Sequence, residues 1–308
     1  MPGPARVERP RIRDVAALAG VSTATVSYVL NGTEGQTITP RTRERVRRAA
    51  DQLGYVPHRI ARALREGRSP VVLLNVGTMM GGSTVSALVE GMTAELRRHG
   101  HTLLVTSEPR GIGADVIDAV APRATLDLTV VADGTAEDDV VSGVVAGDHA
   151  GFAFHTATQL GHLAARGHRR IAFAVPPGAA PFARARADHA RRSAPTLGLA
   201  QLAVIEVGPI ETVRRLVEDP TLTAVATYDD DLALAVLSAM AELGARAPHD
   251  LAVIGFDEGL AGALWRPGLT TVRIDGAGYG VRAARVALGL PAPEWTAPPS
   301  TVVVRESA

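Results

Sequence analysis

The sequence contains neither cysteine nor lysine. Its 308 residues include no Cys, and all 32 basic residues are arginine. The absence of cysteine excludes a disulfide scaffold, a thiolate nucleophile and every metal site built on thiolates. With no lysine and no Gly-x-Ser-x-Gly elbow, the common covalent nucleophiles are few. An enzyme is therefore not expected, and an α/β sugar-processing enzyme in particular lacks a catalytic constellation.

Long apolar runs are missing too. No stretch approaches the ~18 residues needed to span a bilayer, and the N-terminus leads into arginines rather than an apolar signal segment. We therefore expect a cytoplasmic chain without a membrane partner. Apolar residues still make up 46% of the composition, enough for a sizeable core. The length allows a small module plus a larger domain.

Charge is distributed unevenly although the net charge is zero. Residues 1–70 hold 13 arginines against 6 acidic residues, a net of +7. Residues 71–308 hold 19 arginines against 26 acidic residues, a net of −7. A basic head on an acidic body indicates that the head meets a polyanion.

The head is predicted to contain three short helices. The first ends at Gly20, which tolerates the left-handed backbone of a helix C-terminus. Ser22 is a suitable cap for the second helix, which ends at Asn31. Such a pair joined by a glycine turn is typical of a helix-turn-helix unit, here over residues 12–31. A third helix, capped by Thr39, would close the core and carry an arginine-rich outer face.

Beyond this pattern, residues 13–64 contain several short segments whose residues, order and spacing are specific. They are Arg13-Asp14-Val15-Ala16, Ala19-Gly20-Val21-Ser22, Thr25-Val26-Ser27, Leu30-Asn31-Gly32, Arg43-Glu44-Arg45-Val46, Leu53-Gly54-Tyr55-Val56-Pro57 and Ala61-Arg62-Ala63-Leu64. The set resembles the head of the lactose-repressor/galactose-repressor (LacI/GalR) family of bacterial transcription regulators. The alternative is a helical hairpin with no role in DNA binding.

The resemblance implies roles for side chains of the second helix, which would enter the major groove of operator DNA. Base-facing positions would be Thr23, Ala24 and Tyr28. Phosphate contacts would come from Thr25, Ser27 and Asn31. Tyr28 departs from the polar or basic residue more usual at its position, which leaves the preferred half-site open.

Residues 58–65 resemble the hinge helix of the family. So short a helix is not stable in water without partners, and in the family it orders on DNA. His58 and Arg62 are assigned to DNA binding within it. Leu64 matches the leucine that is inserted between base pairs in the minor groove, where it kinks the duplex.

From residue 71 the pattern alternates short apolar runs with amphipathic helices, which predicts an α/β fold with mostly parallel sheets. The predicted strands are Val71–Val76, Thr102–Thr106, Leu126–Ala132, Arg170–Val175, Ala203–Val207, Thr223–Thr227 and Leu251–Phe256. So many strands favour two similar lobes. The resemblance extends into this body and implies a periplasmic-binding-protein-like domain that holds a small effector between its lobes.

The candidate effector-binding residues follow from the same resemblance. Arg186, Asp229 and Asp257 match positions that bind effector hydroxyls or carboxylates, at the strand ends where α/β sheets place ligands. Phe154 stands where an aspartate is frequent.

The first-lobe wall would be formed by Gly81, Gly82, Thr84 and Val85, which offer few groups to sugar hydroxyls. We therefore expect no free hexose or pentose as effector. Either the effector is larger or less hydroxylated, or the cleft has closed and lost effector control.

Other signals are given simpler interpretations. The glycine-rich residues 276–280 are expected to be a loop entering a helix rather than a phosphate site. Asp229, Asp230 and Asp231 precede a helix, where a capping role explains them better than a metal. His162 and His168 have no third ligand in sight. No cofactor and no metal are expected.

The prediction is thus a sequence-specific DNA-binding regulator that binds a pseudo-palindromic operator as a homodimer; repression is favoured, and activation stays open. Residues 1–57 would bind DNA, residues 58–70 would form the hinge, and residues 71–308 would bind an effector and dimerise. The alternative is a solute-binding protein with the same body fold. That class would need a signal peptide and has no use for a +7 head.

Overall fold

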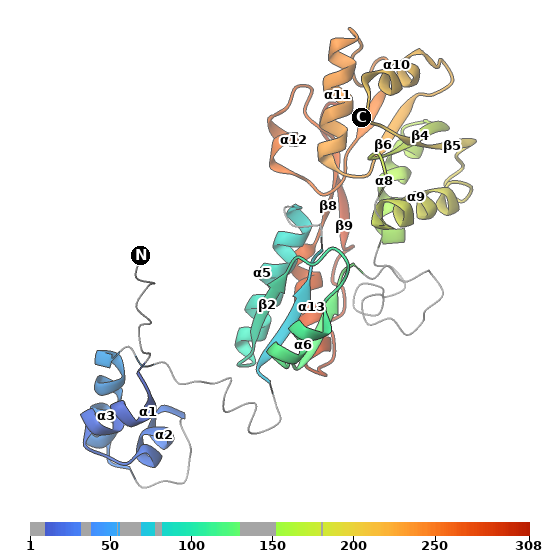
Figure 1. Ribbon diagram of the computed structural model, residues 1–308. Coiled ribbons are helices and arrows are strands. Elements are labelled where there is room, and N and C mark those ends of the chain that lie inside the picture. Colours follow the sequence, from blue (N-terminus) through green and yellow to red (C-terminus); the bar gives the residue numbers. More distant parts are fainter. Residues whose placement is uncertain are drawn as a thin grey trace, which may run out of the picture. The chain divides into compact units, whose positions relative to one another are not determined.

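The computed structural model describes residues 10–31, 38–53, 55, 69–77, 82–129, 152–179 and 181–308 (Figure 1). The chain divides into two compact units, Met1–Arg68 and Ser69–Ala308. Each unit has its own buried core.

The first unit contains the three predicted helices, α1 (Ile12–Ala19), α2 (Thr23–Asn31) and α3 (Pro40–Leu53). Their apolar stripes meet in one core of Val15, Ala16, Ala19, Val26, Val29, Val46, Ala49 and Ala50.

The predicted helix ends of this unit are confirmed. Gly20 has φ 60° and ends α1. The Ser22 hydroxyl accepts the Thr25 amide at 3.1 Å, and the Thr39 hydroxyl accepts the Thr42 amide at 3.3 Å. Because these caps satisfy amides that a helix leaves free, they fix where α2 and α3 begin.

The second unit consists of two lobes, each with a parallel sheet (Figure 1). Lobe 1 has the strand order β2-β1-β3. Its elements are β1 (Val71–Asn75), α5 (Ser83–Arg98), β2 (Thr102–Thr106), α6 (Ala114–Val120), β3 (Ala124–Asp127) and, from the C-terminal part of the chain, α13 (Gly276–Ala287). All five residues of β1 are buried, as expected for a central parallel strand.

Lobe 2 has the strand order β5-β4-β6-β7. Its elements are α8 (Phe152–Ala165), β4 (Arg170–Val175), α9 (Pro181–Ser193), β5 (Gln201–Glu206), α10 (Ile210–Glu218), β6 (Ala224–Thr227), α11 (Asp230–Glu242), β7 (Ala252–Ile254) and α12 (Leu260–Leu264). Apolar clusters cover both faces of this sheet. The predicted α/β architecture with two lobes is confirmed.

Two strands that the sequence did not predict connect the lobes. β8 (Thr271–Ile274) and β9 (Ser300–Val303) pair antiparallel. Ile274 packs against the core of lobe 1, while Val302 packs against a core of lobe 2. In Figure 1 the pair runs between the two lobes. At four residues each, these strands are too short for a periodicity to stand out.

The prediction for residues 276–280 was partly wrong, because these glycines lie inside α13 and not in a loop before it. A Cβ at Gly280 would lie 2.1 Å from the Leu88 carbonyl oxygen of α5. A Cβ at Gly91 would lie 2.3 Å from the Ala277 oxygen. Glycine is therefore required here so that the two helix backbones can touch.

The predicted strand Leu126–Ala132 was also wrong in its limits, since β3 is Ala124–Asp127. The Asp127 carboxylate accepts the Thr129 amide at 2.9 Å and the Thr129 hydroxyl at 2.6 Å. This turn, made by a side chain binding the backbone two residues on, ends the strand. Residues 130–132 lie outside the described part of the chain.

Among the residues that the structure describes, none of the helices has both the length and the apolar character to cross a bilayer.

Candidate functional site

The second helix of the first unit presents a mixed polar face to solvent. Thr23, Ala24 and Tyr28 are exposed, Tyr28 at 36%. On the opposite side Val26 and Val29 are buried in the core. The three predicted base-facing positions therefore share one accessible surface of α2.

The described phosphate-binding positions of the prediction are less exposed than the base-facing ones. Thr25 and Ser27 are half-buried, and the Thr25 hydroxyl lies 2.9 Å from that of Ser22. Asn31 is the last residue of α2, and its side chain lies outside the described part of the chain. His58, Arg62 and Leu64 are likewise outside the described residues.

Helix α3 presents several exposed basic side chains. Arg41, Arg45 and Arg47 are exposed. Arg48 is exposed as well and forms an ion pair with Glu44 at 3.0 Å. Exposed arginines of this kind attract a polyanion at long range.

In the second unit, Arg186 of α9 is turned into the core of lobe 2 and is only 1% exposed. Its guanidinium donates to the Tyr228 carbonyl oxygen, to Gln159 Oε1 at 2.8 Å and to the Thr156 hydroxyl at 3.4 Å. Its Cζ lies 3.3 Å from the centre of the Phe256 ring. Burial lowers the Arg186 pKa to about 9, which still leaves the group charged at neutral pH.

Gln159 of α8 links that guanidinium to the ends of two strands. Its side-chain NH₂ donates to the carbonyl oxygens of Thr227 and Gly255, both at 2.9 Å, and of Ile254 at 3.3 Å. These carbonyls lie at the C-terminal ends of β6 and β7, where α/β sheets commonly present polar groups to ligands. In this protein the glutamine side chain occupies them.

Asp229 and Asp257 lie within electrostatic reach of Arg186, whose pKa both carboxylates raise. Asp229 caps α11 by accepting the Leu232 amide at 2.8 Å, so the predicted capping role is confirmed. Burial raises the pKa of both aspartates. The structure thus brings three of the four predicted effector residues into one region.

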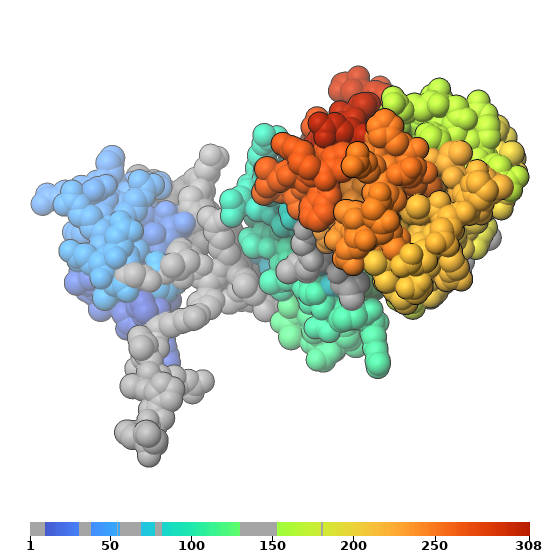
Figure 2. Space-filling view, turned by 90° about the horizontal axis from the view of Figure 1, so that it is seen from above, coloured from blue at the N-terminus to red at the C-terminus, as the bar shows by residue number. Residues whose placement is uncertain are grey.

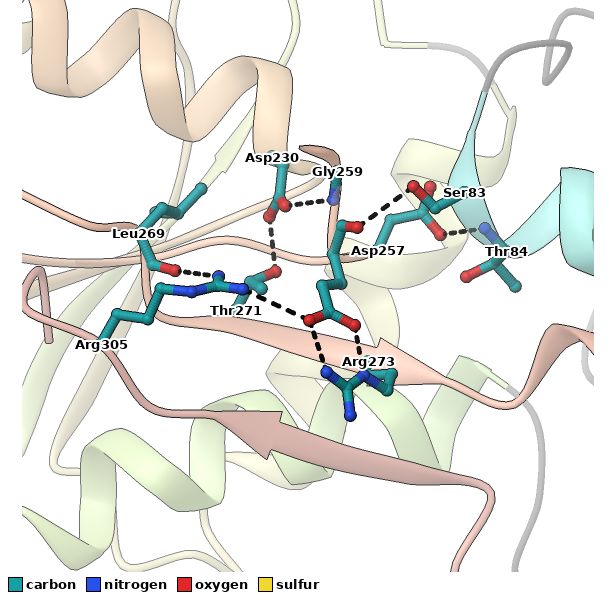
Figure 3. A network of polar contacts seen from close by, with 10 residues as sticks. Ser83, Thr84, Asp230, Asp257, Gly259, Leu269, Thr271, Arg273 and Arg305 are labelled. Atoms are coloured by element: carbon teal, nitrogen blue, oxygen red, sulfur yellow. Dashed lines mark hydrogen bonds and ion pairs between the residues drawn. The ribbon is translucent and has the colours of Figure 1, made fainter. Parts of the chain in front are cut away.

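The Asp257 side chain forms a hydrogen bond with the other lobe. Its carboxylate accepts the amide of Thr84 in the first turn of α5 at 2.9 Å (Figure 3). Hydrogen bonds from Thr84 and Ser83 counteract the effect of burial on its pKa.

The next residue, Glu258, holds the loop after β7 in place. Its carboxylate pairs with Arg273 of β8, at 2.7 Å for the Nη2 contact, and with Arg305 at 3.3 Å. Asp230, 4% exposed, accepts the Gly259 amide at 2.7 Å and the Thr271 hydroxyl at 2.5 Å (Figure 3). Burial raises the pKa of Asp230 to about 6.

Phe154, the fourth predicted effector residue, is half-buried on α8. Its ring meets that of His155 edge-on at 5.9 Å. His155 Nε2 lies 2.9 Å from the Tyr279 hydroxyl of lobe 1, and burial lowers the His155 pKa to about 3. His155 is therefore neutral and belongs to an aromatic contact between the lobes.

The predicted first-lobe wall is partly visible. Gly82 caps α5, and Thr84 and Val85 follow in its first turn, half-buried. Gly81 lies outside the described residues. Within the described ranges, no three His, Asp or Glu side chains are grouped so that they could hold a metal ion.

Sequence reasoning missed Thr156, Gln159, Glu258, Arg273 and Arg305. Each matters through a partner far along the chain, so spacing gave no signal for it. Only Glu258 had a local hint, as the acidic neighbour of Asp257.

Two family profiles match the chain. One, described as "Bacterial regulatory proteins, lacI family", covers residues 11–58. The other, "Periplasmic binding protein-like domain", covers residues 160–308. The chain is similar to the lacI family of bacterial regulatory proteins, so the resemblance noted in the head is confirmed. It is a DNA-binding transcription regulator.

Individual relatives agree with this assignment. The HTH-type transcriptional regulator CelR of Thermobifida fusca is 28% identical over 87% of each chain. The lactose operon repressor of Escherichia coli (strain K12) is 27% identical over 85% of this chain and 79% of its own. The HTH-type transcriptional repressor PurR of Vibrio cholerae serotype O1 (strain M66-2) is 28% identical over 85% of each chain. These relatives are named as transcription regulators.

Solved structures share the fold. The lac repressor dimer bound to operator and the anti-inducer ONPF has a TM-score of 0.74 and 21% identity, covering 97% of this chain and 99% of the other. The CelR–cellobiose complex has a TM-score of 0.60 and 24% identity, covering 97% and 100%.

Proposed function

We propose that this protein is a repressor that binds a pseudo-palindromic operator as a homodimer. The carrying observation is the accessible face of α2, with Thr23, Ala24 and Tyr28 opposite a buried apolar face. A helix of this form fits the major groove, where side chains near its N-terminus reach base edges. The lac repressor structure, a dimer on operator DNA, supports the two-fold arrangement.

The remaining contacts are assigned by position. Thr25, Ser27 and Asn31 would bind phosphates and fix the register of α2. His58 and Arg62 would add contacts from the hinge. Leu64 would be inserted into the minor groove and bend the duplex.

The division of labour follows the two units. Residues 1–57 would bind DNA, residues 58–70 would form the hinge, and residues 71–308 would dimerise and carry any effector response. The CelR structure contains cellobiose, but Arg186, Asp229 and Asp257 already have protein partners here. A free monosaccharide would leave hydroxyls unpaired at about 1–3 kcal/mol each, so we propose that none is the effector.

We also propose that the protein is not an enzyme and works in the cytoplasm, where its DNA target lies. The carboxylates of Asp229, Asp230 and Asp257 accept hydrogen bonds from backbone amides. They are thus engaged as structural acceptors, a role that competes with proton transfer.

The test is fluorescence anisotropy with the DNA upstream of the protein's own gene and with sites selected from a random library. We expect the full two-fold site to bind at least about 100-fold more tightly than one half-site, because both heads of a dimer then contribute. Affinity should fall about 10³-fold between 50 and 200 mM salt if roughly six phosphates are contacted. Equal binding to full and half sites would contradict the dimer, and failure to select any sequence would contradict the function.

A further inference from the structure

Asp257 crosses from lobe 2 to the first turn of a helix in lobe 1. Its carboxylate accepts the Thr84 amide at 2.9 Å, and the Ser83 hydroxyl donates to the Glu258 carbonyl oxygen at 3.2 Å. Helix α5 spans 16 residues, and Gly82 at its N-cap provides no side-chain cap. The amides at this end need an acceptor, and a negative charge there is favoured by the helix dipole. Asp257 supplies both.

The loop that carries Asp257 is fixed in an unusual backbone conformation. Asp257 has φ 97° and Glu258 has φ 48°, both in the left-handed region. Such strain persists only where surrounding contacts impose it. Here Arg273 and Arg305 hold the Glu258 carboxylate, and Asp230 holds the Gly259 amide (Figure 3). The Asp257 carboxylate is therefore held in position toward α5 rather than meeting it by chance.

The two contacts bring distant parts of the body together. In Figure 2 the teal atoms of lobe 1 lie against the orange atoms of the segment after β7. The nearby polar groups of lobe 2 are satisfied within that lobe, since Arg186 donates to Gln159 and Tyr228. No ligand is needed to neutralise or bridge these groups in the arrangement observed.

We propose that Asp257 is a built-in latch that holds the two lobes together without an effector. The Asp257 carboxylate binds the N-terminus of α5 and so takes the part of a bridging ligand. Within lobe 2, Gln159 accepts a hydrogen bond from the Arg186 guanidinium, which leaves that group with a partner from the chain itself. The contact itself is independent of the proposed function, and only its role in regulation rests on that function. Lobe closure would then be the resting state of this regulator.

The experiment measures the distance between the lobes in the full chain. Because the protein has no cysteine, spin labels can be attached at Ala94→Cys in α5 and Ala235→Cys in α11, both exposed positions. Double electron–electron resonance then reports the distance distribution without added ligand. We expect one narrow population for the otherwise unaltered chain.

Asp257→Gly removes the carboxylate while glycine accepts φ 97° without strain. We expect the ratio of long to short distances to rise about tenfold or more, as for loss of a hydrogen bond to a charged group. Asp257→Asn keeps the acceptor and shape but loses the charge, and should raise the ratio about threefold. The matched control Asp231→Asn, an exposed aspartate of the same lobe, should leave it unchanged.

If Asp257→Gly does not fold, Asp257→Asn decides the matter. A distribution unchanged from the parent in the folded Asp257 variants would overturn the latch. Operator binding is measured separately on the same proteins. If the parent chain bound no operator DNA, the proposed function would be refuted, but the measured distances would still test the latch.

Discussion

The polar side chains on the face of α2 are exposed, whereas those near the boundary between the lobes are buried or hydrogen-bonded within the protein. On α2, Thr23 and Tyr28 are exposed and available to a partner. In the second unit, Arg186 is buried within lobe 2 and Asp257 is hydrogen-bonded to α5 of lobe 1. Both sets were predicted from matched positions in the sequence. The difference teaches that a matched residue type does not reveal whether its side chain is free to bind or already has a partner.

The largest effect is expected at Arg186, where a structural role of the side chain can be distinguished from a role in binding. Arg186→Ala would leave Gln159 and the Tyr228 carbonyl without their donor and remove a cation stacked on Phe256. We expect the free energy of unfolding to fall by about 3–5 kcal/mol, as for other broken buried charge networks. Urea unfolding measures this.

The matched control is Arg191→Ala on the same helix. Arg191 is exposed and pairs with Asp188 at 2.7 Å, so its loss should matter by less than about 1 kcal/mol. If Arg186→Ala were no more harmful than Arg191→Ala, Arg186 would be a free binding group after all.

The buried carboxylate of Asp230 gives a pH test of the same contrast. Its pKa rises from 3.8 to about 6 on folding, so the folded state holds the proton more tightly. The resulting stabilisation is complete below pH 3.8 and is lost as the pH rises through about 6. We expect the stability of the wild type relative to Asp230→Asn to fall by up to about 3 kcal/mol between pH 4 and pH 7.

Urea unfolding at a series of pH values gives both curves. Asp231→Asn, which alters an exposed neighbour, should keep the wild-type slope. Parallel curves for the wild type and Asp230→Asn would mean that Asp230 does not titrate as a buried group.

Much of the fold could be predicted because its signals are local. Gly20, Ser22 and Thr39 set helix ends through neighbours a few residues away, and the central strands are continuous apolar runs. β8 and β9 escaped prediction because their pairing joins segments almost thirty residues apart. The glycines of α13 were misinterpreted because their reason lies in α5.

The candidate sites divide in the same way. The accessible face of α2 follows from helical spacing within nine residues. The bond between Asp257 and Thr84 joins residues 173 positions apart, and that between Gln159 and Gly255 joins residues 96 apart. No local pattern contains such partners. Only the structure therefore shows that the polar side chains near the lobe boundary already have hydrogen-bond partners within the protein.

The central claim is that α2 reads DNA sequence through its exposed side chains. It is tested most directly by selecting bound sequences from a random library with the wild type, Tyr28→Ala and Ser27→Ala. Tyr28→Ala should relax the preferred base at one or two positions, by about 1–3 kcal/mol at each. Ser27→Ala should weaken all sequences alike. A Tyr28→Ala profile identical to that of the wild type would contradict the placement of α2 in the major groove.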